Sequence, residues 1–176
     1  MSKPIVFIPG HTYGTGATTY TGLNEYDFNR CLCLQLATLE GVTVAHRYYE
    51  NYSTYVKSLA GYIPSDAIVI SLHLNSASID VQGSEVLTSM RDYKMVNLSE
   101  LLLAKFCKDF GTRNRGVKQP DERGGKLIEN ISNSLIWEPF FCNHRDEISS
   151  RFLDNPDYGI SLMLKFWREA IDEYLR

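Results

Sequence analysis

Short, unbroken apolar runs alternate along this chain with longer segments of helical periodicity. A strand that is apolar at nearly every position, as residues 4–8 and 67–72 are, is typical of a parallel sheet covered by helices on both faces. The predicted strands are residues 4–8, 42–46, 67–72, 84–88 and 135–137, and the predicted helices are residues 23–39, 52–62, 93–110 and 158–175. The alternation favours βαβ crossovers, so we expect a mostly parallel, twisted α/β sheet with helices on both faces.

The chain has the length and composition of one globular domain. Its 176 residues are 44% hydrophobic and 22% charged, which is ordinary for a folded protein and excludes disorder, collagen and coiled coil. No repeat or linker rich in proline, glycine or serine interrupts the sequence. We therefore expect residues 1–176 to form a single domain without a second one.

Charge and the first residues limit the classes of partner. A formal net charge of −3 disfavours broad binding to nucleic acid or to anionic membranes, since both need basic surfaces. The apolar run that ends at Pro9-Gly10 is too short for a signal-peptide core or a membrane span. We expect synthesis in the cytoplasm without a signal peptide and no membrane insertion. The four cysteines contain no Cys-x-x-Cys pair, which favours reduced thiols.

Three reactive side chains directly follow predicted strands. His11, His73 and Glu138 come after residues 4–8, 67–72 and 135–137. The carboxyl ends of parallel strands meet at one edge of the sheet, where such folds build their sites. Glu25 lies in the first turn of the predicted helix over residues 23–39, for which Thr21 is the expected cap, and the helix dipole favours a carboxylate there.

Two imidazoles and a carboxylate form the ligand set of a catalytic zinc ion, which keeps a fourth position for water. A second glutamate can then exchange a proton with that water and with a leaving amine, an arrangement that suits amide hydrolysis. Taken singly, each residue has another interpretation: a histidine at a strand end can simply be packed, Glu25 can serve the helix dipole, and Glu138 can be a solvated loop residue. The pattern therefore supports a metal or acid/base site and does not identify the substrate.

At these residues the sequence resembles the zinc-dependent N-acetylmuramoyl-L-alanine amidases of the amidase-3 type, which occur in bacterial cell-wall enzymes and phage endolysins. The matching segments run through most of the chain. They are Ile5-Val6-Phe7-Ile8-Pro9-Gly10-His11, Gly22-Leu23-Asn24-Glu25, Ser71-Leu72-His73-Leu74-Asn75, Gly83-Ser84-Glu85, Arg115-Gly116-Val117-Lys118 and Ile136-Trp137-Glu138-Pro139-Phe140-Phe141-Cys142-Asn143, followed by Glu147.

The resemblance implies a function and assigns roles to these residues. His11, Glu25 and His73 would bind one Zn²⁺ ion, and Glu138 would be the catalytic acid/base. The substrate would be peptidoglycan, cut between N-acetylmuramic acid and L-alanine. A phage endolysin of this kind would accumulate in the host cytoplasm and reach the periplasm and wall once a holin-type release factor permeabilises the membrane.

The sequence departs from the family pattern near the first histidine, and its substrate contacts are less defined. Ile8 stands where the family usually has aspartate, and Thr12-Tyr13 replaces a common Gly-Gly. Under the resemblance Asn75, Arg115 and Lys118 are candidates for substrate binding. For Arg115 and Lys118, a solvated basic loop is an equal alternative.

Two other functions stay open. A zinc peptidase or carboxypeptidase on a related sheet would cut between amino acids of the stem peptide. A non-catalytic wall-binding protein could keep the same fold without catalysis, although such a protein would be expected to lack a ligand or the base.

Overall fold

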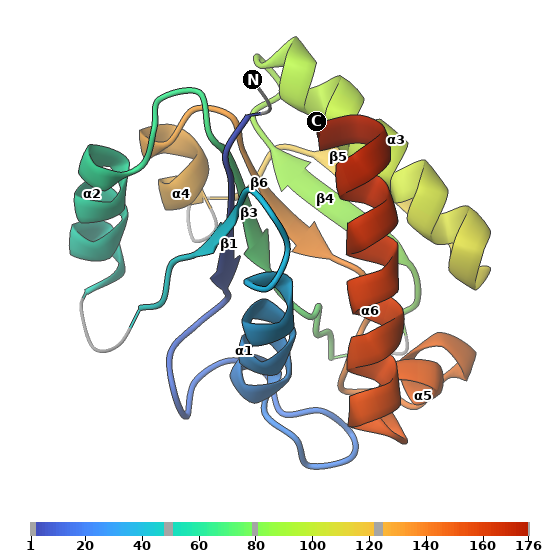
Figure 1. Cartoon of the computed structure of the whole chain (residues 1–176). Coiled ribbons are helices and arrows are strands. Elements are labelled where there is room, and N and C mark those ends of the chain that lie inside the picture. The colour runs from blue at the N-terminus through green and yellow to red at the C-terminus, as the bar shows by residue number, and fades with distance from the viewer. Residues whose placement is uncertain (1–2, 48–50, 79–80, 122–124, 176) are drawn as a thin grey trace.

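The computed structural model describes residues 3–47, 51–78, 81–121 and 125–175, which form a six-stranded sheet with helices on both faces (Figure 1). The strand order across the sheet is β2-β1-β3-β6-β4-β5. The strands are β1 (Ile5–Pro9), β2 (Val42–Val44), β3 (Ile68–Leu72), β4 (Ser84–Thr88), β5 (Asn114–Lys118) and β6 (Ser134–Glu138).

The sheet is mostly parallel, as the alternation of strands and helices predicts. Strands β2, β1, β3 and β6 run in one direction. Strand β4 runs antiparallel to β6, and β5 is parallel to β4. The carboxyl ends of β1, β3 and β6 therefore lie at one edge, and the amino end of β4 lies at that same edge.

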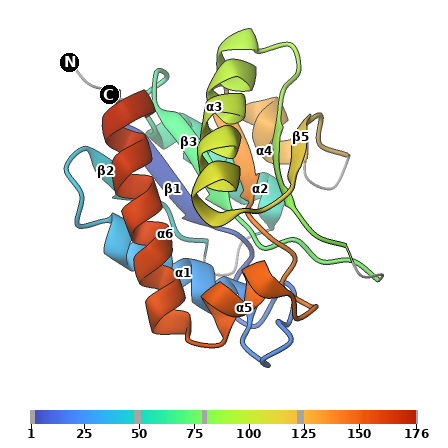
Figure 2. The same ribbon diagram turned by 90° about the vertical axis from the view of Figure 1, so that its right-hand side faces the viewer.

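Helices cover the two faces of the sheet in separate layers. The helices are α1 (Glu25–Leu36), α2 (Tyr52–Tyr62), α3 (Tyr93–Phe110), α4 (Gly125–Asn130), α5 (Glu147–Leu153), α6 (Pro156–Ala170) and the π-helix η1 (Ile171–Leu175). Helices α1, α3, α5 and α6 share a core with Ile5 and Phe7, whereas α2 and α4 share a second core with Val6 and Ile8. In Figure 2 helices α3 and α6 lie in front of the sheet. Successive residues of β1 thus serve opposite cores, which explains its unbroken apolar sequence.

The first helix begins later than the sequence analysis predicts. Asn24, and not Thr21, is its cap, because the Asn24 side chain accepts a hydrogen bond from the Tyr26 amide. The Thr21 hydroxyl lies 2.9 Å from that of Thr19 within the preceding loop. Glu25 is therefore the first residue of α1, where its carboxylate meets the positive end of the helix dipole.

The second half of the chain contains more regular structure than predicted. Residues 114–118, for which a basic loop was one interpretation, form the edge strand β5. Helices α4 and α5 are short, and neither shows enough periodicity to be recognised in the sequence. No helix in the described ranges is long and apolar enough to cross a membrane.

The contact between α5 and α6 depends on a glycine. A β-carbon on Gly159 would lie 2.1 Å from the carbonyl oxygen of Phe152, whereas one on Gly61 in α2 would meet nothing within 4 Å. We expect Gly159→Ala to lower the free energy of unfolding by about 1–3 kcal/mol, because backbone must move to admit the methyl group. Gly61→Ala should be neutral or stabilising by up to about 1 kcal/mol. Urea unfolding of both variants tests this, and equal midpoints would contradict it.

Candidate metal centre and acid–base site

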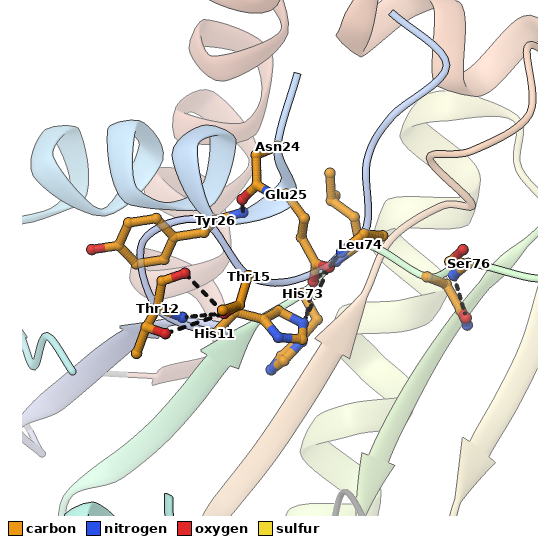
Figure 3. A network of polar contacts seen from close by, with 11 residues as sticks. His11, Thr12, Thr15, Asn24, Glu25, Tyr26, His73, Leu74 and Ser76 are labelled. Carbon is orange, nitrogen blue, oxygen red and sulfur yellow. Dashed lines mark hydrogen bonds and ion pairs between the residues drawn. The ribbon is translucent and has the colours of Figure 1, made fainter. Parts of the chain in front are cut away.

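Three side chains from separate elements converge at the carboxyl edge of the sheet. His11 follows β1, His73 directly follows β3, and Glu25 opens α1. Figure 3 shows the two imidazoles directed toward the Glu25 carboxylate. The topology accounts for the meeting, because β1 and β3 are adjacent parallel strands that end together.

The Glu25 carboxylate lies between the two histidines. Its Oε2 is 3.1 Å from Nε2 of His11, and its Oε1 is 3.2 Å from Nδ1 of His73. One ligand atom from each of the three residues fits within 4.8 Å of the others, and within the described ranges this is the group of histidine, cysteine and acidic side chains arranged to hold a metal. His46 and His144 are not part of it.

Backbone amides fix the carboxylate from the other side. Ala17 N donates to Oε2 and Leu74 N donates to Oε1, each at 2.9 Å. Glu25 is only 2% exposed. Burial alone would raise the pKa of Glu25, but hydrogen bonding and the charges of His11 and His73 outweigh burial and hold the pKa well below its usual value. Glu25 is therefore an ionised, oriented carboxylate in a buried position.

This donor set fits a zinc-sized cation. In a tetrahedral zinc site with bonds of about 2.0–2.2 Å, neighbouring ligand atoms are roughly 3.3 Å apart. The two nitrogen–oxygen separations at Glu25 are close to that value. A buried carboxylate also requires a positive partner, and a cation shared with two neutral imidazoles supplies one.

Two glycines allow the backbone to approach the histidines closely. A β-carbon on Gly10 would lie 2.5 Å from the Leu72 carbonyl oxygen and 2.6 Å from Cε1 of His73. Gly16 has a φ of +97°, and a β-carbon there would lie 2.9 Å from Cδ2 of His11 and 3.0 Å from Oε2 of Glu25. His11 itself has a φ of 68°, in the left-handed region that non-glycine residues rarely adopt.

In the first loop Thr12, which stands where the family pattern usually has a glycine, is linked to Thr15. Thr12 N donates to Oγ1 of Thr15 at 3.0 Å, and that hydroxyl donates to the Thr12 carbonyl oxygen at 2.9 Å (Figure 3). Ile8, the other departure, lines the cavity beside the site. The unusual residues thus leave the three converging side chains in place.

Glu138 lies at the end of β6 and faces the same cavity as the histidines. This cavity has a volume of about 400 Å³, and His11, His73 and Glu138 are among its lining residues. Oε2 of Glu138 is buried and has no hydrogen-bond partner among the described residues. Burial, together with the negative charges of Glu25 and Glu85, raises the pKa of Glu138 well above its usual value. Glu138 can therefore hold a proton at the edge of the cavity.

Glu85 connects the three predicted substrate-binding residues. It is the cross-strand partner of Glu138, because β4 is antiparallel to β6. Arg115 Nε donates to its Oε2 at 2.7 Å, Lys118 Nζ to the same oxygen at 2.6 Å, and Asn75 Nδ2 to its Oε1 at 2.8 Å. Burial would raise the pKa of Glu85, but Lys118 and Arg115 lower it overall.

The structure thus brings together His11, Glu25 and His73, with Glu138 on the same cavity, and gathers Asn75, Arg115 and Lys118 around Glu85. The sequence analysis assigned no role to Glu85 or Gly16. The signal for Glu85 was a carboxylate in a strand otherwise suited to burial, which requires cationic partners nearby. No sequence signal distinguishes Gly16 from a glycine that only shapes the loop.

Comparison with known proteins identifies relatives of the whole fold. The sequence profile of the N-acetylmuramoyl-L-alanine amidase family matches residues 5–163. A search of curated proteins finds no match.

Solved structures of similar fold include three described as amidases or endolysins. An N-acetylmuramoyl-L-alanine amidase from Clostridium difficile 630 has a TM-score of 0.72 at 17% identity, over 99% of this chain and 100% of that chain. The amidase AmiC2 of Nostoc punctiforme has a TM-score of 0.75 at 22% identity, over 98% and 97%. The catalytic domain of the CD27L endolysin targeting Clostridia Difficile has a TM-score of 0.68 at 22% identity, over 97% of each chain.

The close approach of Gly16 to His11 and Glu25 leads to a prediction about metal binding. We expect Gly16→Ala to displace one of these side chains and weaken Zn²⁺ binding by about 10–100-fold, the effect usual for residues that orient metal ligands. Gly14→Ala is the matched control, because Gly14 also has a positive φ but nothing within 4 Å of an added β-carbon. Competition with a chelator measures both affinities. Equal weakening in the two variants would show that backbone strain alone is responsible.

Proposed function

We propose, since the chain belongs to the N-acetylmuramoyl-L-alanine amidase family, that one Zn²⁺ ion held by His11, Glu25 and His73 and a proton carried by Glu138 perform its reaction. The family establishes the reaction itself. The protein is a peptidoglycan hydrolase that cuts the amide bond between N-acetylmuramic acid and the L-alanine of the stem peptide, and it acts on the cell wall. The observation that supports the proposed site best is the buried Glu25 carboxylate between two imidazoles.

A zinc ion at this site would polarise the substrate carbonyl and lower the pKa of a water molecule to about 7. His11, Glu25 and His73 would hold it through two nitrogens and a carboxylate oxygen. Ala17 N and Leu74 N keep that carboxylate in one orientation through their hydrogen bonds. Residues that orient ligands in this way contribute to metal affinity as well as to geometry.

Glu138 would move the proton. Its carboxyl lines the cavity beside the histidines, and burial favours its protonated form. A cation at the neighbouring site acts in the opposite direction and favours the ionised form. The same group can therefore accept a proton from the attacking water and donate it to the nitrogen of the departing L-alanine.

Asn75, Arg115 and Lys118 would contribute to substrate binding through the charge of their cluster. Two cations share one carboxylate, so one positive charge is left over at the β4–β5 side of the site. Lys118 is the more exposed of the two, with 41% of its side chain accessible. A peptidoglycan carboxylate could approach Lys118 while Arg115 remains against Glu85 and the Phe141 ring.

An endolysin role is supported by the similarity to the CD27L catalytic domain and by the resemblance noted in the sequence. An enzyme of this kind would act on the wall after a holin-type factor has opened the membrane.

Product analysis tests the reaction and its metal dependence together. Digestion of purified peptidoglycan should release stem peptides with a free L-alanine amino terminus and leave an unsubstituted lactyl group on the glycan, as mass spectrometry would detect. A chelator should abolish this release, and added Zn²⁺ should restore it, because two imidazoles and a carboxylate form the ligand set of a catalytic zinc ion. Products in which L-alanine stays attached to muramic acid would instead indicate a stem-peptide peptidase.

The role of Glu138 is tested by removing its proton-carrying group. Glu138→Ala and Glu138→Gln should lower turnover by at least about 100-fold, the low end of what proton transfer contributes. Zinc content should be unchanged, since Glu138 is not a proposed ligand. Glu147→Gln is the control, because that glutamate belongs to the same family segment but is 87% exposed and paired with Arg151. Full activity of the Glu138 variants would end the assignment.

A further inference from the structure

The cavity beside the proposed metal site extends to an arginine that has no ion pair with any carboxylate of the described residues. Arg47, Tyr52 and Tyr55 line the cavity together with His11, His73 and Glu138. Arg47 follows β2, so it lies on the side of the site opposite to the Glu85 cluster. The cavity therefore connects the proposed reaction centre to the Arg47 guanidinium, and Asp121 also lines it.

The Arg47 guanidinium contacts an aromatic ring and has no ion pair with a carboxylate of the described residues. Cζ of Arg47 lies 5.0 Å from the centre of the Tyr52 ring, which is a cation–π contact. Its Nε is buried and has no hydrogen-bond partner among the described residues. Three other arginines of the described residues pair with carboxylates: Arg115 with Glu85, Arg145 with Asp154 and Arg151 with Glu147.

Because the Nε atom is covered by protein, a ligand in the cavity would meet the terminal N–H groups of Arg47, a partly exposed residue that lines the cavity. An arginine held against an aromatic ring presents its remaining N–H groups as a fork that matches a carboxylate. The ligand for this position is therefore a carboxylate that enters the cavity. In peptidoglycan such a carboxylate belongs to the stem peptide, because the sugars near the scissile bond are uncharged.

The sheet gives the spacing of the strands that precede the reaction centre and this subsite. Strand β2 is next to β1 and two positions from β3, which corresponds to roughly 5 and 10 Å at the usual strand spacing. An extended peptide advances about 3.3–3.6 Å per residue. A carboxylate at Arg47 would thus belong to the second or third residue of a stem peptide whose first residue is the L-alanine at the scissile bond.

We propose that Arg47, held by Tyr52, binds the α-carboxylate of the second stem-peptide residue and makes the enzyme prefer stems in which that carboxyl is free over stems in which it is an amide. The inference rests on the proposed function, since it takes the scissile bond to lie at the His11–Glu25–His73 site. It places the peptide on the β2 side of the site and leaves the β5 side to the remainder of the substrate.

Two substrates and three variants test the proposal. The substrates are muropeptides that differ only in whether the α-carboxyl of the second residue, a glutamate, is free or amidated. For wild type we expect a higher kcat/KM with the acid. In Arg47→Met the ratio of kcat/KM for acid over amide should fall by about 10–100-fold, mainly through KM for the acid, as for loss of a charged hydrogen bond. Arg47→Lys should recover only part of the ratio, because the fork is lost.

Controls separate a subsite from a structural role. Arg91→Met removes an exposed arginine outside the cavity and should leave the ratio unchanged. Melting temperature and zinc content of each variant report folding. An equal loss on both substrates, or no loss at all in Arg47→Met, would overturn the proposal while leaving the amidase assignment intact. A wild-type enzyme that cleaves neither substrate would overturn the proposed function, and the subsite with it.

Discussion

The site is organised around one buried carboxylate. Glu25 is 2% exposed, and its carboxylate oxygens meet two backbone amides and the imidazoles of His11 and His73. Because burial of an unpaired carboxylate is strongly unfavourable, the loop before α1 and the ends of β1 and β3 must remain together for the fold to be stable. The residues that would bind a metal are thus also the residues that join three elements of the fold.

The reversal of one strand gives the two sides of the site different character. If β4 were parallel to β6, Glu85 would lie at the opposite edge of the sheet and could not face Glu138. In the antiparallel arrangement Glu85 adds negative charge beside Glu138 and receives Arg115 and Lys118 from β5. On the β2 side no comparable carboxylate pairs with Arg47 among the described residues. On the β5 side, Glu85 offsets one of the two positive charges of Arg115 and Lys118. On the β2 side, Arg47 lines the cavity.

The sequence predicts the site residues better than their surroundings. His11, His73 and Glu138 could be placed together because parallel strands end at a common edge, and Glu25 because a helix starts there. The direction of β4 is not encoded in its own residues, so the pairing of Glu85 with Glu138 could not be foreseen. The surroundings of Arg47 could not be foreseen either, because its lack of an ion pair among the described residues depends on where all its neighbours lie. The expected meeting of these side chains at one sheet edge, which rests on topology, is confirmed, whereas the helix cap predicted at Thr21 is wrong because Asn24 is the cap.

Glycines show why a composition-based interpretation of the first loop is insufficient. Gly14 and Gly16 both have positive φ and lie two residues apart, so a sequence pattern treats them alike. A β-carbon added at Gly16 would meet His11 and Glu25, whereas one added at Gly14 would meet nothing within 4 Å. The requirement at Gly14 is for backbone freedom, and the requirement at Gly16 is for volume. The space at Gly16 is limited by His11 and by Glu25, which is the first residue of α1. The shape of this site therefore depends on the assembled sheet edge as well as on the loop that carries His11.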